Sequence, residues 1–302
     1  MPELPDVTIY VEALERRVLG APLERLRVGS PFVLRSVEPP IAEAEGRRVT
    51  GVRRLGKRIV LALEPDRFLI LHLMVAGRLR WRPRGVTVPR GRGLAALDLP
   101  HGAVLFTEEG KQHKAGLWYV RGESALAEHD SGGIEPLAAS PESFRAALTR
   151  ERHTLKRALT DPRLFSGIGN AYSDEILHAA RLSPLQMTTN LDADGIARLH
   201  AATQRMLTLW TERLRAEVGD GFPEKVTALR EGMAVHGRFK QPCPACGSPV
   251  QRIRYAENEV NYCAGCQTGG RVLADRGLSR LLREDWPRSL DEWEARLGGE
   301  LR

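Results

Sequence analysis

Residues 236–267 read HGRFKQPCPACGSPVQRIRYAENEVNYCAGCQ, and this stretch holds all four cysteines of the 302-residue chain. Cys243 and Cys246 form one Cys-x-x-Cys knuckle, and Cys263 and Cys266 form a second. Two such knuckles can supply four thiolates to a tetrahedral structural Zn²⁺, and their separation fits a two-stranded ribbon. Because four thiolates leave no open position for water, the sequence predicts one structural zinc ion and no catalytic metal.

The charge balance favours a polyanionic partner. Lysine and arginine total 45 against 38 acidic residues, a net charge of +7, which suits nucleic acid but also an ordinary basic surface. The opening MPELPDV lacks the basic and apolar regions of a signal peptide, and no apolar run is long enough to span a bilayer. We therefore expect a cytoplasmic protein, monomeric, with no membrane association.

The N-terminal segment predicts an amphipathic helix. Val7, Val11, Leu14 and Val18 recur at helical spacing, and Pro5 precedes them. A helix that begins so close to the N-terminus can hold the first residues against the body of the protein.

The pattern of apolar and polar residues then changes twice along the chain. From residue 48 to 120, short apolar runs alternate with glycine, proline and charged turns, which predicts an antiparallel sheet or sandwich, and after Ser140 the pattern is helical. The expected strands include 58–63, 68–74 and 103–106, and the expected helices include 153–160, 171–181 and 196–214. We expect domains at 1–130, 131–235 and 236–272, followed by a charged tail at 273–302.

Pro2 and Glu3 form a candidate catalytic pair. Initiator methionine is normally removed before a small residue, which would leave Pro2 with a free secondary amine. An α-amino group has a pKa of roughly 7.7–8.0, so part of it is neutral at physiological pH and can attack a sugar C1′. Glu3 beside it can move a proton as general acid or base. The pair alone is also compatible with ordinary residues that precede the first turn of a helix.

Three motifs together carry a resemblance: MPELPDV, GIGNAYSDEIL at 167–177, and HGRFKQPCPACG with YCAGCQ in the ribbon. The chain resembles the formamidopyrimidine-DNA glycosylase/endonuclease VIII family over nearly its whole length, in the right order. The resemblance implies an α+β fold with an N-terminal β-sandwich and flanking helices, then a helix-two-turn-helix domain and a zinc ribbon. It also implies that Pro2 is the nucleophile and Glu3 is essential, and it matches a family acidic residue with Asp6.

Several residues are candidates for contact with damaged DNA. Gly167 and Gly169 allow close backbone approach, and Asn170 adds a donor where a helix begins, an arrangement suited to phosphate. The resemblance places Lys156 near the lesion. It places Lys57, in the Leu55–Arg58 turn, near the DNA backbone as a catalytic aid.

A base in duplex DNA must be flipped out, and an apolar wedge commonly supports the gap. In the family a methionine after a His-Leu pair serves this role. Here the segment is His72-Leu-Met-Val-Ala-Gly77. The wedge is Met74 or, by strict alignment, Val75, and His72 itself can be a hydrogen-bonded core residue.

Family arginines are absent at two places in this chain. The Asp-Pro-Arg-Arg-Phe-Gly loop that fills the gap opposite the lesion is replaced by residues 107–116, TEEGKQHKAG. Lys111, His113 or Lys114 can substitute, although none reproduces a planar guanidinium. The arginine five residues before the third cysteine is Asn258, and Arg252, Arg254 or Arg271 can take over its phosphate contact.

The sequence therefore predicts a bifunctional DNA glycosylase and abasic-site lyase that excises oxidised bases, with purines first. Two alternatives stay open. One is an abasic-site lyase with little base excision, which the altered loops favour. The other is a non-catalytic protein that binds damaged DNA, which Pro2 and Glu3 argue against.

Overall fold

The computed structural model describes residues 1–110, 113–224, 226, 229–255, 258–274, 289–290 and 292. The chain folds into two compact units. The first comprises Met1–Gly132 with Leu209–Ala228, and the second comprises Gly133–Thr208 with Leu229–Arg302. Most of the predicted tail after residue 274 lies outside the described residues.

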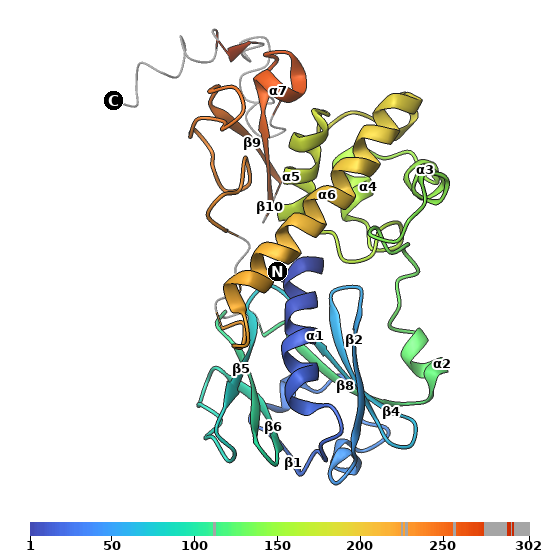
Figure 1. The fold of residues 1–302 in the computed structure, drawn as a ribbon, viewed down its shortest axis with the longest axis vertical. Coiled ribbons are helices and arrows are strands. Elements are labelled where there is room, and N and C mark those ends of the chain that lie inside the picture. Colours follow the sequence, from blue (N-terminus) through green and yellow to red (C-terminus); the bar gives the residue numbers. More distant parts are fainter. Residues whose placement is uncertain are drawn as a thin grey trace. The chain divides into compact units, whose positions relative to one another are not determined.

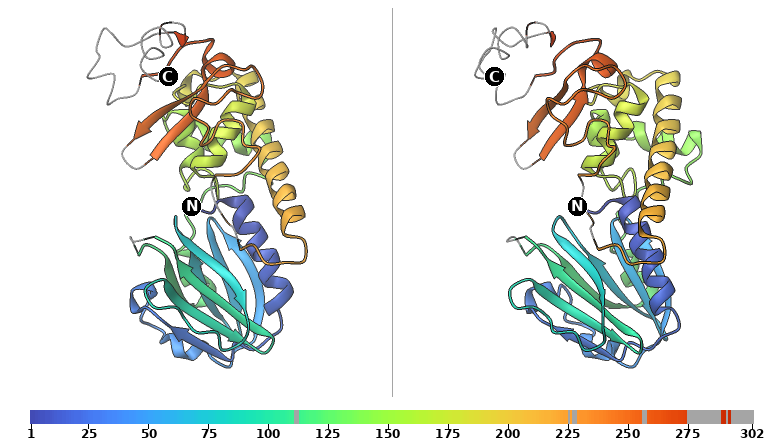
Figure 2. Two further views of the ribbon diagram at one scale, coloured as in Figure 1. Left: turned by 90° about the vertical axis from the view of Figure 1, so that its left-hand side faces the viewer. Right: turned by 60° about the vertical axis from the view of Figure 1, so that its left-hand side comes forward.

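The first unit is a β-sandwich of two four-stranded antiparallel sheets, which confirms the predicted fold (Figures 1 and 2). One sheet has the order β1-β6-β7-β5 and the other β2-β3-β4-β8. Their strands are β1 (Arg25–Val28), β2 (Val49–Leu55), β3 (Arg58–Leu63), β4 (Arg67–His72), β5 (Gly77–Arg82), β6 (Gly93–Leu99), β7 (Gly102–Glu108) and β8 (Gly116–Arg121).

Helices cover this sandwich. Helix α1 (Leu4–Val18) places Val7, Tyr10 and Leu14 in the same buried cluster as residues from both sheets, such as Ile59 and Phe106. Helix α2 (Gly122–Ala127) packs Leu126 on the other face of the β2-β3-β4-β8 sheet. The strands of that sheet are therefore apolar on both faces, which explains their nearly continuous hydrophobic runs. Two short 3₁₀ turns lie at Pro31–Val33 and Ile41–Ala44.

Three connections of the sandwich carry candidate site residues. Gly56 and Lys57 join β2 to β3 as a two-residue turn, with Gly56 at φ +61°. Residues 73–76 join β4 to β5, so the strand predicted to reach Met74 ends at His72. Residues 109–115 join β7 to β8.

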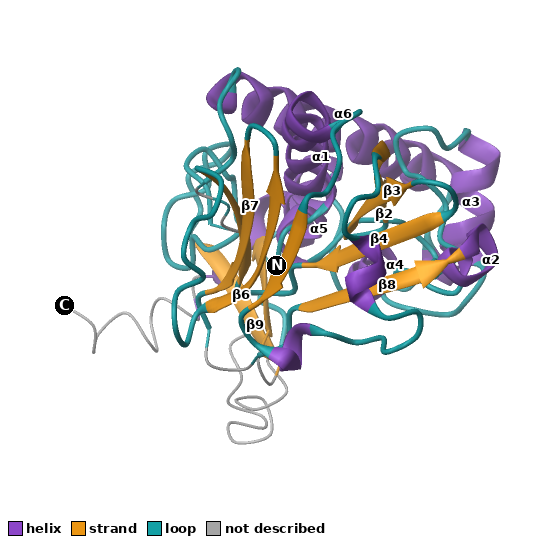
Figure 3. Ribbon diagram, turned by 90° about the horizontal axis from the view of Figure 1, so that it is seen from below, coloured by secondary structure: helices purple, strands orange, loops and turns teal. Residues whose placement is uncertain are grey.

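The second unit contains most of the helical region predicted after Ser140, and the ribbon (Figure 3). Its helices are α3 (Pro141–Thr149), α4 (Leu155–Thr160), α5 (Asn170–Ala180), the first part of α6 (Ala193–Val218) and α7 (Ala264–Thr268), with a 3₁₀ turn at Thr188–Asn190. Strands β9 (Val250–Tyr255) and β10 (Asn258–Cys263) form the predicted antiparallel ribbon.

The boundary of the first unit differs from the boundary expected at residue 130. Its first segment ends at Gly132, and Leu209–Ala228 belongs to it as well, although the sequence placed that stretch in the second domain. The physical reason is packing: Val226 is buried in the sandwich core and Phe222 packs against it. Among the described helices, none is both long and apolar enough to cross a bilayer.

Candidate functional site

Helix α1 fixes the N-terminal residues. Pro2 and Glu3 are both buried. Glu3 is the N-cap of the helix, and its backbone N–H donates to the Asp6 carboxylate over 2.9 Å. Since the inner face of α1 is part of the sandwich core, the first residues are anchored as the sequence predicted.

The charges around the N-terminus act on its amine. Burial lowers the pKa of the Met1 amine, while the carboxylates of Glu3 and Asp6 oppose this shift and the cations of Arg78 and Lys57 add to it. The structure thus brings Lys57 into the electrostatic surroundings of the first residues. It adds Arg78, which the sequence analysis did not single out.

His72 is a neutral, hydrogen-bonded residue at the end of β4. Burial, with a smaller contribution from the charges of Arg58 and Lys57, lowers its pKa to about 4. Its Nδ1 accepts the Met74 N–H at 3.1 Å. The hydrogen of the neutral ring therefore lies on Nε2, which remains a donor.

The turn after His72 presents Val75. Met74 has φ +50°, and the Gly77 N–H donates to Leu73 O over 2.8 Å, which closes the turn. A Cβ on Gly77 would lie 2.3 Å from that same oxygen, so only glycine fits. Arg78 donates to the carbonyls of Val75 and Gly77. Val75 is 61% exposed, whereas Met74 is partly buried.

The loop between β7 and β8 is held by the side chain of Glu108, at the end of β7. Glu108 is buried, and its Oε1 accepts the N–H groups of Lys114 and Ala115 at 3.0 and 3.2 Å. His113 and Lys114 are exposed. Lys111 lies outside the described residues.

In the second unit, Asn170 begins α5. Gly167 has φ +80°, and Gly169 is the N-cap in extended backbone. The Asn170 side chain donates to Glu259 O in β10 over 2.9 Å, which leaves one amide hydrogen for another acceptor.

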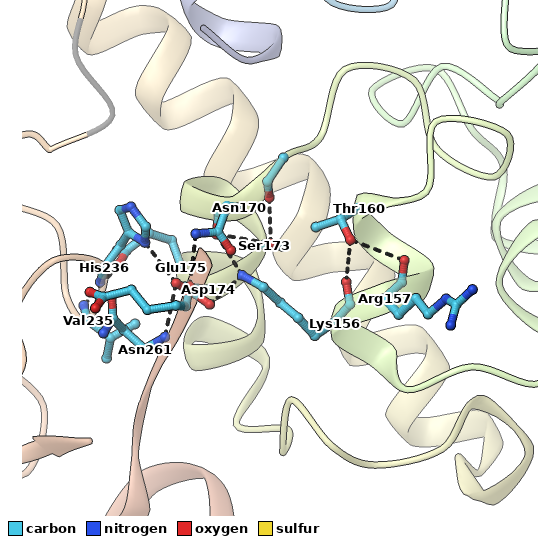
Figure 4. A network of polar contacts seen from close by, with 12 residues as sticks. Lys156, Arg157, Thr160, Asn170, Ser173, Asp174, Glu175, Val235, His236 and Asn261 are labelled. Carbon is cyan, nitrogen blue, oxygen red and sulfur yellow. Dashed lines mark hydrogen bonds and ion pairs between the residues drawn. The ribbon is translucent and has the colours of Figure 1, made fainter. Parts of the chain in front are cut away.

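Lys156 points into the protein (Figure 4). Its Nζ donates to Asn170 O over 2.7 Å and lies 2.5 Å from Asp174 Oδ1. The other oxygen, Asp174 Oδ2, faces His236 Nδ1 at 2.8 Å and accepts the Asn261 N–H at 3.1 Å. The sequence analysis placed Lys156 near the lesion, but in the structure its ammonium is buried beneath Asn170.

A second carboxylate ties α5 to the start of the ribbon segment. Glu175 accepts the backbone N–H groups of Ala234, Val235 and His236 at 2.7, 2.9 and 2.9 Å. Sequence reasoning missed both carboxylates, although Asn170 and Asp174 stand four residues apart in the GIGNAYSDEIL motif and so share a helix face.

The four cysteines gather as a group that could hold a metal ion. All four Sγ atoms lie within 4.8 Å of one another. The pairs Cys243–Cys266 and Cys246–Cys263 are 3.9 and 3.3 Å apart, close to the roughly 3.8 Å that tetrahedral Zn–S bonds of about 2.3 Å require. His178 Nε2 lies 3.2 Å from Cys243 Sγ, and burial lowers the pKa of this imidazole. The neutral ring can donate an N–H to the sulfur.

Asn258, which stands where the family has an arginine, begins β10. Of the candidate replacements, Arg252 stacks on Phe239, 4.1 Å from the ring centroid, and lies 3.6 Å from the Glu259 carboxylate. Arg254 and Arg271 are exposed.

Two family models and a curated relative match the chain. The family model for the formamidopyrimidine-DNA glycosylase N-terminal domain matches residues 1–131, and the model for the H2TH domain of the same enzymes matches residues 133–216. The formamidopyrimidine-DNA glycosylase of Thermus thermophilus is 34% identical over 279 residues, 89% of this chain and all of that protein.

Two further proteins are similar. A formamidopyrimidine-DNA glycosylase-like protein of Mycobacterium tuberculosis is 38% identical over 151 residues, 50% of this chain and 94% of that protein. The Lactococcus lactis enzyme, solved as a mutant with DNA containing Fapy-dG, has a TM-score of 0.77 at 22% identity, covering 88% of this chain and 100% of that one.

The chain belongs to the formamidopyrimidine-DNA glycosylase family, which confirms the resemblance drawn from its motifs. Enzymes of this family are DNA glycosylases of base excision repair that also have lyase activity at abasic sites, and this chain is one of them.

Proposed function

We propose that the mature protein excises oxidised or ring-opened purines from DNA with the secondary amine of Pro2 as nucleophile. The observation that carries the proposal is the setting of the N-terminus. It is anchored by α1, Pro2 is buried there, and the Glu3 and Asp6 carboxylates lie beside it. The neutral form of the Pro2 amine is the nucleophile.

The chemistry follows from these groups. The Pro2 nitrogen attacks C1′ of the damaged nucleoside, the glycosidic bond breaks, and the base leaves with its bonding electrons and takes up a proton. As the sugar ring opens, a proton on O4′ and loss of the remaining amine hydrogen give an iminium between the proline nitrogen and C1′. Glu3 is the group placed to transfer these protons. The iminium acidifies the neighbouring C2′ hydrogen, which allows elimination of the 3′ phosphate.

Donors in each unit can grip the DNA backbone. Lys57 and the Nε2–H of His72 offer donors from the sandwich, and Asn170 offers an amide N–H at the N-terminus of α5. The Gly167–Gly169 segment allows a phosphate to come close to the backbone. Lys156 acts as a positioning residue, because its ammonium holds the Asn170 carbonyl. Val75 is the wedge that enters the space of the flipped base.

The metal is zinc, held by the four cysteines in a structural role. Their spacing suits tetrahedral Zn–S bonds, and the donor set is all sulfur. His178 supports Cys243 from outside the ligand set.

The expected substrate is inferred from the family. The L. lactis relative was solved with Fapy-dG in its DNA, a ring-opened purine, so we place such lesions first and oxidised pyrimidines and abasic sites next. An abasic-site lyase with little base excision is the second candidate, and the altered β7–β8 loop favours it.

Borohydride reduction in the presence of lesion DNA and abasic-site DNA tests these functions. The proposed enzyme forms a covalent adduct with both substrates. A lyase with little excision forms it with abasic DNA alone, and a binding protein forms none. Absence of any adduct would overturn the proposal.

A further inference from the structure

A second group of side chains that could hold a metal ion lies in the second unit, apart from the four cysteines. Carboxylate oxygens of Glu151 and Asp161 and a ring nitrogen of His153 all lie within 4.8 Å of one another. Glu151 and His153 belong to the connection between α3 and α4, and Asp161 is the C-cap of α4. Two carboxylates and one imidazole are a donor set that divalent metal ions take in proteins.

The backbone that carries these side chains is fixed. The Thr188 N–H donates to His153 O over 2.8 Å, and the Thr188 hydroxyl donates to Glu151 O over 3.0 Å. The His153 N–H donates in turn to Thr188 Oγ1 at 3.4 Å, and Thr188 is buried. The N–H of Asp161 donates to Arg157 O in α4 over 3.0 Å. The donor atoms are therefore carried on an ordered backbone, which lowers the cost of ordering a site around a ligand.

The ring of His153 gives the observation that points to a ligand. Within the part of the chain that the structure describes, its Nε2 is enclosed and makes no hydrogen bond. Glu151 Oε2 nevertheless lies 2.8 Å from this nitrogen. Two metal ligands at right angles, each bound at about 2.0–2.1 Å, stand about 2.9 Å apart. A metal ion bound to both atoms would account for their closeness and give the buried nitrogen a partner.

Arg163 is the cation that lies against this group. Its guanidinium donates to both oxygens of Asp161, at 3.1 and 2.6 Å, and lies 3.5 Å from Glu151 Oε2. The Asp161 side chain is 10% exposed, whereas that of Arg163 is 56% exposed. An exposed guanidinium can rotate into water, and pairs of this kind contribute little to stability. The two carboxylates thus already hold positive charge, in the form of a group that a metal ion can displace.

We propose that Glu151, His153 and Asp161 form a binding site for a hydrated divalent transition-metal ion of the Zn²⁺ class, and that Arg163 competes with this ion for the carboxylates. The imidazole nitrogen favours this class over Mg²⁺ and Ca²⁺, which prefer oxygen ligands. With three protein ligands and a competing arginine, the site binds metal more weakly than four thiolates do. It therefore fills when metal is supplied, whereas the cysteine site keeps its zinc through purification.

The site stands at the beginning of the segment that joins α4 to α5. Asp161 O accepts the N–H groups of Leu164 and Phe165, both over 3.0 Å. An ion bound to Asp161 and to the connection between α3 and α4 adds a cross-link to this segment. Because a ligand that binds only the folded state raises the free energy of unfolding, the ion stabilises the second unit.

The experiment titrates Co²⁺ into the full-length protein with its cysteine site already loaded with zinc. Co²⁺ bound to oxygen and nitrogen gives weak visible bands, whereas Co²⁺ bound to thiolates gives an intense charge-transfer band in the near ultraviolet. We expect one Co²⁺ per chain with the visible bands alone, displaced by Zn²⁺ and not by an equal concentration of Mg²⁺. A thiolate band alone, equal displacement by Mg²⁺, or binding that does not saturate would overturn the proposal.

Two variants are expected to change the Co²⁺ affinity in opposite directions. His153→Ala removes a ligand, so the loss should reach at least the roughly 10–100-fold that follows removal of an outer partner of a ligand. Arg163→Gln removes the competing cation and should tighten binding by about two- to fivefold, a gain that misfolding cannot produce. Unchanged affinity in either variant would overturn the assignment.

Matched controls exclude adventitious binding to other histidines and a general effect of charge. His101→Ala removes an exposed histidine in the turn between β6 and β7, and Arg157→Gln removes an exposed arginine of α4. Both should keep the wild-type affinity for Co²⁺. A loss in His101→Ala as large as that in His153→Ala, or a gain in Arg157→Gln equal to that in Arg163→Gln, would refute the site.

Discussion

Lys156 Nζ lies 2.5 Å from Asp174 Oδ1 in a buried pair, with side chains 10% and 0% exposed. The opposite oxygen of the same carboxylate is shared by His236 and the backbone of β10. One carboxylate thus joins helix α4, helix α5 and the ribbon.

Removal of Asp174 is expected to destabilise the second unit. Asp174→Ala leaves the ammonium of Lys156 buried without its counter-charge, which costs about 3–5 kcal/mol. Urea unfolding monitored by circular dichroism measures this loss. The double variant Lys156→Met, Asp174→Ala should recover part of it, and a double variant no more stable than the single one would contradict the pairing.

Salt dependence separates Lys156 from Lys57. If Lys156 positions Asn170 and does not touch phosphate, Lys156→Met weakens DNA binding without changing the slope of log K against log salt. Lys57→Met should reduce that slope by about 1, the value for one phosphate contact. Binding titrations at several salt concentrations give both slopes, and a reduced slope for Lys156→Met would mean that its ammonium reaches the DNA.

The nucleophile is tested at the N-terminus. Pro2→Gly should largely abolish adduct formation while DNA binding survives. Glycine lacks the cyclic secondary amine of proline, and its backbone is not restrained by a ring. Retained Met1 would place the Pro2 nitrogen in a peptide bond and block it. Mass spectrometry of the active protein decides this point, and full activity in protein that keeps Met1 would refute the mechanism.

Glu3→Gln separates proton transfer from binding. The substitution keeps the shape of the side chain but removes a proton carrier, so excision should fall by about 10²–10⁴-fold with little change in DNA affinity. Single-turnover rates and equilibrium binding are compared on the same substrate. Equal losses in both would assign Glu3 a structural role.

His72 makes stability depend on pH. Its pKa is about 4 in the folded protein against 6.5 for the free residue, so the unfolded chain binds the proton more tightly. The contribution is full above pH 6.5 and is lost as the pH falls toward 4, by about 3 kcal/mol in all. His72→Gln should flatten the unfolding free energy over this window, whereas an unchanged pH profile would show that the imidazole is not held neutral.

Metal analysis should give one zinc per chain, and chelation should unfold the ribbon. His178→Ala removes the imidazole whose Nε2 lies 3.2 Å from Cys243 Sγ, and loss of such a support typically weakens metal affinity by about 10–100-fold. Competition with a chromophoric chelator measures the affinity. His101→Ala, at an exposed histidine outside both groups that could hold a metal ion, is the control.

The sequence predicted the sandwich, the helical region and the ribbon because each has a local signature. Alternating apolar runs, the helical spacing after Ser140 and the paired Cys-x-x-Cys knuckles all act over short distances. The turn that carries Lys57 was found in the same way.

Long-range contacts were not predictable. The inward direction of Lys156 depends on Asp174, which is 18 residues away on another helix. Phe222 and Val226 join the sandwich core from beyond α6, and no spacing rule shows this. The partner of Glu108 is likewise set by the path of a loop rather than by its sequence.

Glu175 accepts hydrogen bonds from three backbone amides, and these bonds limit how the ribbon can be exchanged between proteins. A ribbon cut out at Ala234 leaves its α5 carboxylate behind, and each amide buried without an acceptor costs about 1–3 kcal/mol. A functional graft therefore has to carry α5 along with the cysteines. The unit to transfer is therefore α5 together with the ribbon, with the cut placed upstream of Gly167.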